Sequence, residues 1–157
     1  MCDMTPRAVA SFSTTTDAPS LARSFAGRSL CPAHAAEADV ATKLMTSELV
    51  TDAVRFGAPP IEVSLECRIS ELVVTVTDRG ASSDESGLRG GAASTSSRLD
   101  RSQTELSRLL VDKVARDWSI EPTTEGRLLW CTVPTGTVPR AASRGAGAMA
   151  HRLQRFP

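Results

Sequence analysis

Residues 41–56 read ATKLMTSELVTDAVRF, and this stretch decides how the rest of the chain is interpreted. Apolar residues recur along it at helical spacing, so we expect a buried helix. Glu48 and Asp52 lie four residues apart, which makes them neighbours on one face of that helix. Two like charges at this spacing repel each other by about 0.2–0.5 kcal/mol. Either a bound cation relieves the repulsion, or Arg55 neutralises Asp52 on a solvated face.

The segments on either side of this helix predict an α+β domain. The expected elements are, in order, a strand at 8–14, helices at 21–30 and 35–56, strands at 61–68 and 72–78, a helix at 102–117, and a hairpin of strands at 118–120 and 127–133. This order predicts a two-layer sandwich, with the helices on one face of a mixed, largely antiparallel sheet.

Two signals place the third helix. Ser102 and Glu105 match a capping box, which sets its start. Leu106, Leu109, Leu110 and Val114 then recur at helical spacing and are expected to face the core.

The domain is expected to span residues 8–134. Residues 1–7 and the Gly-, Ala- and Arg-rich tail at 135–157 show no periodicity and are predicted to be disordered. The segment 79–102 is a long loop of Gly, Ser, Arg and Asp, and loops of this length are typically functional or unstructured.

Composition excludes several classes of function. Acidic and basic residues each number 18, so the chain has no charge bias towards nucleic acid or a membrane surface. No apolar run approaches the ~18–20 residues needed to span a bilayer, and no signal peptide is recognisable. The cysteines contain no C-x-x-C pair, so we expect no zinc site, and Cys67 and Cys131 are interpreted as small buried hydrophobes. A cytoplasmic, reducing location is expected.

The stretch SELVTDAVRFG resembles the N-box helix of the GHKL ATPase superfamily, and in particular its anti-sigma-factor serine/threonine kinases, where the pattern is SELVTNAVRHG. The resemblance implies that Glu48 is the catalytic residue, which polarises the attacking group. It implies that Asp52, where the family has Asn, binds ATP by holding its Mg²⁺ ion. A carboxylate is a suitable oxygen ligand for that ion.

Asp78-Arg-Gly80 follows an expected strand and resembles the second GHKL motif, D-x-G. The resemblance implies that Asp78 accepts a hydrogen bond from the adenine amino group and that Gly80 lets the base approach the backbone. The alternative is an ordinary turn, because Asp and Gly are common turn residues.

The third motif departs from the family. Glu105 and Ser107 stand where a G-x-G would receive the triphosphate, and Gly126-Arg-Leu128 stands where the family has Gly-Lys-Thr. Glycines at 87–91 could form a displaced phosphate lid or only a flexible loop. Weakened or absent nucleotide binding is therefore expected.

The resemblance implies an ATP-binding regulatory protein with ATP and Mg²⁺ as cofactors, which phosphorylates or sequesters a protein partner in transcriptional control. That partner would be a sigma factor or an anti-anti-sigma-type protein, and a homodimer is compatible with this role. The alternative is a catalytically inactive GHKL-like binding module that acts only by protein–protein contact. Glu48 and Asp78 favour the active kinase, whereas the changed third motif favours the module. A globular α+β domain unrelated to GHKL is the third interpretation.

Overall fold

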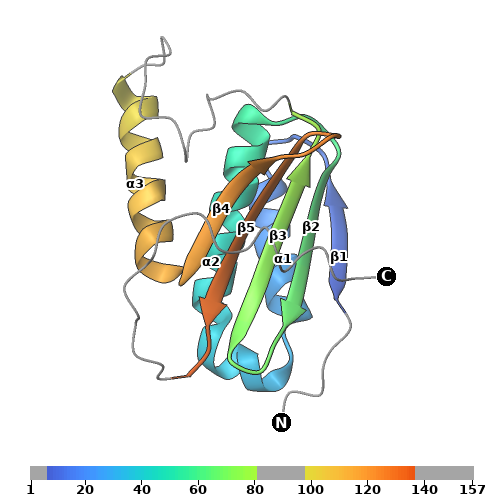
Figure 1. The fold of residues 1–157 in the computed structure, drawn as a ribbon, viewed down its shortest axis with the longest axis vertical. Coiled ribbons are helices and arrows are strands. Elements are labelled where there is room, and N and C mark those ends of the chain that lie inside the picture. The colour runs from blue at the N-terminus through green and yellow to red at the C-terminus, as the bar shows by residue number, and fades with distance from the viewer. Residues whose placement is uncertain (1–6, 81–97, 137–157) are drawn as a thin grey trace.

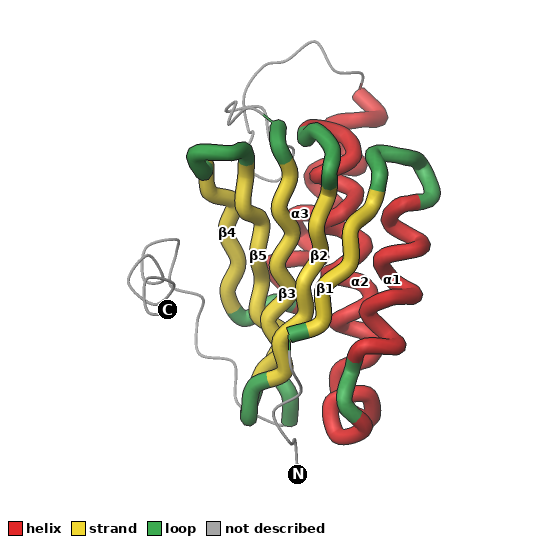
Figure 2. The backbone as a smooth tube through the Cα atoms, turned by 90° about the vertical axis from the view of Figure 1, so that its right-hand side faces the viewer, coloured by secondary structure: helices red, strands yellow, loops and turns green. Residues whose placement is uncertain are grey.

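The protein folds as helices layered on one face of a five-stranded sheet (Figures 1 and 2). The computed structural model describes residues 7–80 and 98–136, with side chains described at 7–80 and 106–136. The elements are β1 (Ala8–Phe12), α1 (Ala18–Ser29), α2 (Pro32–Phe56), β2 (Ile61–Cys67), β3 (Glu71–Asp78), α3 (Arg98–Val114), β4 (Asp117–Pro122) and β5 (Arg127–Pro134). The predicted α+β sandwich is confirmed, and the element order agrees with the sequence.

The strands lie in the order β1-β2-β3-β5-β4. A mixed, largely antiparallel sheet is expected from the sequence, and all four pairings among the described residues are antiparallel. The closing hairpin inserts β5 between β3 and β4, so β3 and β5 form the middle of the sheet. Asp78, the last residue of β3, lies directly opposite Arg127, the first residue of β5.

The core lies between α2 and the central strands. Along β3, buried and half-buried residues alternate, as expected when one face of a strand meets helices. The side chains that α2 and β3 bury completely include Met45, Leu49, Val50, Leu72, Val74 and Val76. This packing fixes the end of α2 against the end of β3.

Prolines and glycines set the limits of α2. Pro32 occupies its first turn, where the missing backbone N–H costs nothing, and Cys31 precedes the helix in an extended conformation. Gly57 closes the helix, with its N–H donating to the Ala53 carbonyl at 2.9 Å. The helix is thus three residues longer at its start than the sequence predicts.

Helix α3 lies at the side of the helical layer, next to α2 and β4 (Figure 1). The prediction that Leu106 and Leu109 face the core is wrong, because their exposed fractions are 59% and 56%. Val111 is fully buried instead, and Val114 is half-buried. A helix at the edge of a layer buries a narrower face than one lying over the sheet. In α3 this buried face contains Val111, and the leucines at 106 and 109 lie outside it.

Several sequence-based expectations lie outside the described residues. These are the N-terminal segment at 1–6, the proposed lid within 81–97, and the tail from 137 onwards. At the inner edge of the tail, Thr135 is buried and its N–H donates to the Ser70 carbonyl at 3.0 Å. Among the helices that the structure describes, none is long and apolar enough to cross a membrane.

Candidate functional site

The ends of three elements meet at one place and bring two of the predicted site residues together. Asp52 lies in the last turns of α2, Asp78 ends β3, and Arg127 begins β5. All three side chains are buried, with exposed fractions of 4% for Asp52, 0% for Asp78 and 2% for Arg127. Their contact follows from the fold, because α2 packs across β3 and β5.

The Arg127 guanidinium bridges the two carboxylates. Its Nη2 donates to Asp78 Oδ2 at 2.6 Å, and its Nε lies 3.1 Å from the same oxygen. Its Nη1 donates to Asp52 Oδ2 at 3.2 Å. Charge-assisted bonds of this forked kind are among the strongest hydrogen bonds in proteins, and they fix the arginine in one orientation.

Asp78 is enclosed on its remaining sides by glycines. The Gly80 N–H donates to Asp78 Oδ1 at 2.7 Å, so Asp78 and Gly80 form an Asx-type turn. A Cβ atom on Gly57 would lie 2.5 Å from Asp78 Cγ, and one on Gly80 would lie 2.8 Å from Asp78 Oδ1. Gly126 has a φ of +156°, and a Cβ there would collide with the Asp78 carbonyl oxygen. The D-x-G sequence is therefore explained by turn geometry and close packing.

Glu48, the predicted catalytic residue, lies one helical turn before Asp52 on α2. It is half-buried, and within the described part of the chain no hydrogen bond or ion pair to it is found. The spacing places Glu48 on the same side of the helix as Asp52. The structure thus brings Asp52, Asp78 and Gly80 together, with Glu48 close along the helix.

Of the two third-motif positions, 105 and 107, the structure describes the side chain only at 107. The backbone of residue 105 lies inside α3, which begins at Arg98, ahead of the capping box expected at Ser102. The side chain of Glu105 lies outside the described residues, and Ser107 is half-buried.

Arg127 is the site residue that sequence reasoning missed. Leu128 stands where the family has Thr, yet strand alternation turns Leu128 to the sheet face opposite that of Arg127 and Asp78. The available signal was the strand period: Arg127 has the same parity as the buried Leu129, Cys131 and Val133. A charged residue at a core-facing position requires a buried partner of opposite charge.

As folded, the site does not fit Mg²⁺–ATP. The Arg127 guanidinium already supplies the positive charge that a magnesium ion at Asp52 would bring. Both Asp78 oxygens accept bonds from Arg127 or Gly80, so the carboxylate is already engaged where an adenine amino group would donate. An arriving nucleotide would have to displace an ion pair from a fully buried position.

The fold and the site together define the class of this protein: a two-layer α+β sandwich with a buried Asp–Arg–Asp bridge at one end of its sheet. Comparison of the sequence with protein-family models and with curated proteins finds no match. The interpretation of its function therefore depends on the residues of the chain itself.

Proposed function

We propose that this chain is a protein-binding regulatory module with a GHKL-like sandwich, in which Arg127 replaces nucleotide and metal at the former ligand positions. The observation that carries the proposal is the buried Asp52–Arg127–Asp78 bridge. Releasing Arg127 would remove the cation from a buried ion pair, which costs about 3–5 kcal/mol in proteins. Nucleotide binding would have to supply that free energy before showing any net affinity.

The kind of partner follows from the sequence resemblance. The N-box-like helix is most similar to that of anti-sigma-factor kinases, so the proposed partner is a sigma factor or an anti-anti-sigma-type protein. The module would act in transcriptional control by sequestering that partner without phosphorylating it. Cys31, Cys67 and Cys131 are buried and form no disulfide in the described part of the chain, which supports a reducing cytoplasmic location.

A second candidate function is the ATP-dependent serine/threonine kinase. One observation favours it: Glu48 is half-buried at the position of the catalytic residue, with no described partner that would occupy it. In this case Arg127 would have to leave Asp52 and Asp78 when Mg²⁺–ATP binds.

A nucleotide titration separates the two functions. Isothermal titration of the unmodified chain with ATP should detect no binding up to millimolar nucleotide, in magnesium or in EDTA. The variant E105G/S107G tests the third motif separately. If E105G/S107G binds ATP with the bridge intact, the changed third motif, rather than the bridge, is what excludes the nucleotide. Micromolar binding by the unmodified chain would overturn the module and favour the kinase.

A partner titration tests the positive half of the proposal. Purified sigma factors and anti-anti-sigma-type proteins from the source genome are immobilised and titrated with the chain. We expect one of them to bind with an affinity that Mg²⁺–ATP does not change, and to remain unphosphorylated by mass spectrometry. Phosphate transfer, or an affinity that depends on ATP, would contradict the module. Failure of every such protein to bind would contradict the proposed partner class.

A further inference from the structure

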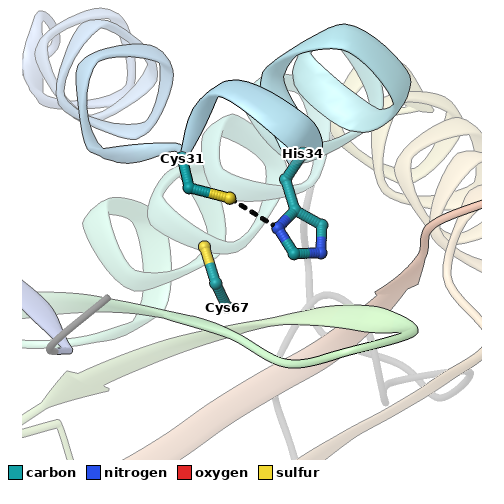
Figure 3. Close-up of side chains that lie close together, drawn as sticks. All are labelled: Cys31, His34 and Cys67. Carbon is teal, nitrogen blue, oxygen red and sulfur yellow. Dashed lines mark hydrogen bonds between the residues drawn. The ribbon is translucent and has the colours of Figure 1, made fainter. Parts of the chain in front are cut away.

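A second cluster of chemically active side chains lies at the opposite end of α2. Cys31 precedes α2, His34 lies in its first turn, and Cys67 ends β2. Their potential ligand atoms all lie within 4.8 Å of one another, and the three residues are buried. Figure 3 shows the Cys67 side chain pointing from the strand toward the other two.

The cluster is distinct from the arginine bridge. Asp52 lies 21 positions after Cys31, which corresponds to about 30 Å along α2 at the helical rise. None of its residues contacts the carboxylates described above. Its chemistry therefore stands independently of the proposed function.

The donor set is that of a thiophilic cation site. Two cysteine sulfurs and one imidazole nitrogen are the ligand types that zinc prefers. Two thiolates balance the charge of a divalent ion, so the filled site would be neutral, as a buried position requires.

The distances are close to those that zinc needs. With Zn–S bonds of about 2.3 Å and Zn–N bonds of about 2.0 Å, tetrahedral ligands stand roughly 3.6 Å apart for S···N and roughly 3.8 Å for S···S. Cys31 Sγ and His34 Nδ1 lie 2.9 Å apart, joined by a hydrogen bond. An ion would replace the proton of that bond, and the distance between the two atoms would increase by less than about 1 Å.

We propose that Cys31, His34 and Cys67 form a zinc site that joins the first turn of α2 to the end of β2. Binding releases the two thiol protons, one from each cysteine, and leaves a fourth coordination position for a water molecule or another ligand. Three protein ligands with an open position predict zinc that exchanges more readily than in a closed four-ligand structural site. The spacing Cys31-Pro-Ala-His34 was the sequence signal for this site, and the expectation of no zinc site overlooked it.

Two other outcomes compete with metal binding. The two cysteines could instead form a disulfide, or the thiol–imidazole hydrogen bond could be purely structural. Both alternatives predict that the reduced protein binds no metal at these residues, so one set of titrations separates them from the proposal.

The test uses the full chain, reduced with a phosphine and stripped of metal. The Cys2→Ser substitution is included throughout, so that every sulfur ligand detected on the metal must come from Cys31, Cys67 or Cys131. Cobalt(II) is titrated first, because its thiolate charge-transfer bands report sulfur ligation directly. We expect one cobalt per chain, displaced by one equivalent of zinc, and two sulfur neighbours by X-ray absorption at the zinc edge. Zinc should raise the melting temperature and EDTA should reverse the rise.

Single substitutions locate the site. Since loss of an outer-shell partner commonly weakens metal binding 10–100-fold, loss of a direct ligand in C31S, H34Q or C67S should weaken it by more than about a hundredfold. Cys131→Ala is the matched control, because Cys131 is also buried but does not belong to the cluster. Its thiol stays protonated at neutral pH, since burial raises its pKa to about 12. The control should bind zinc as the parent does.

The results that overturn the proposal are definite. Absence of thiolate–cobalt bands in the folded, reduced parent would do so without any ligand variant. A Cys31–Cys67 disulfide that persists in the reducing buffer would establish the redox pair instead. Equal loss of affinity in C131A and C67S would show that the metal binds elsewhere, and circular dichroism of each variant excludes unfolding as the cause.

Discussion

Arg127 acts as the counter-ion for two buried carboxylates from different elements, Asp52 on α2 and Asp78 at the end of β3. Buried ion pairs contribute little net stability relative to apolar residues of the same size, because desolvation offsets the attraction. Removing one partner is different, since the remaining charge stays buried. The bridge therefore adds little net stability, but loss of any one of its three charged side chains is expected to be costly.

The first prediction concerns this constraint. Arg127→Met should lower the free energy of unfolding by about 3–5 kcal/mol, because Asp52 and Asp78 lose their counter-ion. Adding Asp52→Asn should recover about 1 kcal/mol or more, since one of the two buried carboxylates becomes neutral. Urea denaturation of the four members of the cycle measures this coupling.

Arg68→Met is the matched control for that experiment. Arg68 pairs with Glu66 at 2.9 Å and lies 3.5 Å from Glu71, but its side chain is 30% exposed. Exposed ion pairs contribute less than about 1 kcal/mol. Equal losses in R68M and R127M would mean that burial of the bridge has no energetic consequence.

The second prediction concerns pH. Burial raises the pKa of the Cys131 thiol to about 12, well above the usual value near 8.5 in an unfolded chain. A raised folded-state pKa favours the protonated native form, so the stability from this group is complete below about pH 8.5. It falls as the pH rises from there towards 12, by up to about 1.4 kcal/mol per pH unit.

Urea denaturation between pH 7.5 and 10.5, in a reducing buffer, tests this slope. Cys131→Ala should be less stable at neutral pH but should lose less stability as the pH rises. All other ionisable groups are common to both proteins, so their contributions cancel in the difference. Parallel curves for C131A and the parent would contradict the assigned cause.

At the scale of the elements, α2 contains polar groups that its packing leaves unsatisfied. The hydroxyls of Thr42 and Thr46 are buried and have no hydrogen-bond partner among the described residues. Thr51, one turn beyond Ser47 on the same helix, donates its hydroxyl to the Ser47 carbonyl at 2.7 Å. The same residue type is therefore present on α2 in two states that can be compared.

The third prediction uses that comparison. Thr46→Val keeps the shape of the side chain and removes the orphan hydroxyl, so it should stabilise the protein by about 1 kcal/mol or more. Thr51→Val removes a hydroxyl that has a partner and should bring no gain. Thermal or urea unfolding of the two variants decides the point. A loss of stability in T46V would indicate that the hydroxyl has a partner in the folded protein.

The fourth prediction concerns the turn that closes α2. A Cβ on Gly57 would lie 2.5 Å from both the Ala53 carbonyl oxygen and Asp78 Cγ, neither of which can move freely. Gly57→Ala should therefore cost more than about 2 kcal/mol, of the order seen for overpacking.

Gly27→Ala in α1 is the contrasting substitution. A Cβ there meets the flexible end of the Lys43 side chain, which can move away. Alanine is better than glycine in a helix by about 1 kcal/mol, so this variant should be neutral or more stable. Equal destabilisation of both variants would show that the contacts around Asp78 are not the deciding factor.

On the scale of the whole molecule, local patterns predicted the elements but not the contacts between distant residues. The alternation in β2 and β3 and the apolar periodicity of α2 are local, and both gave the correct element types. The bridge joins Arg127 to Asp78, which lies 49 positions earlier in the chain, and to Asp52, which lies 75 positions earlier. Only the packed sheet and helix bring these residues together. Which face of α3 is buried also depends on its neighbours, so the spacing of its leucines alone predicted the wrong buried face.

The last prediction follows from the unequal support of the elements. Strands β3 and β5 are hydrogen-bonded on both edges and covered by α2, so their amides can exchange only when much of the domain opens. Helix α3 packs chiefly against α2 and β4, and its described part leaves Leu106 and Leu109 exposed, so the helix from residue 106 onwards buries little apolar area. Local opening of α3 should therefore cost less free energy than opening of the central strands. Hydrogen exchange followed by mass spectrometry should show α3 exchanging well before β3 and β5, with α2 among the slowest segments. Slow exchange of α3, at the rate of β5, would show that more of the helix is held in solution than its described contacts account for.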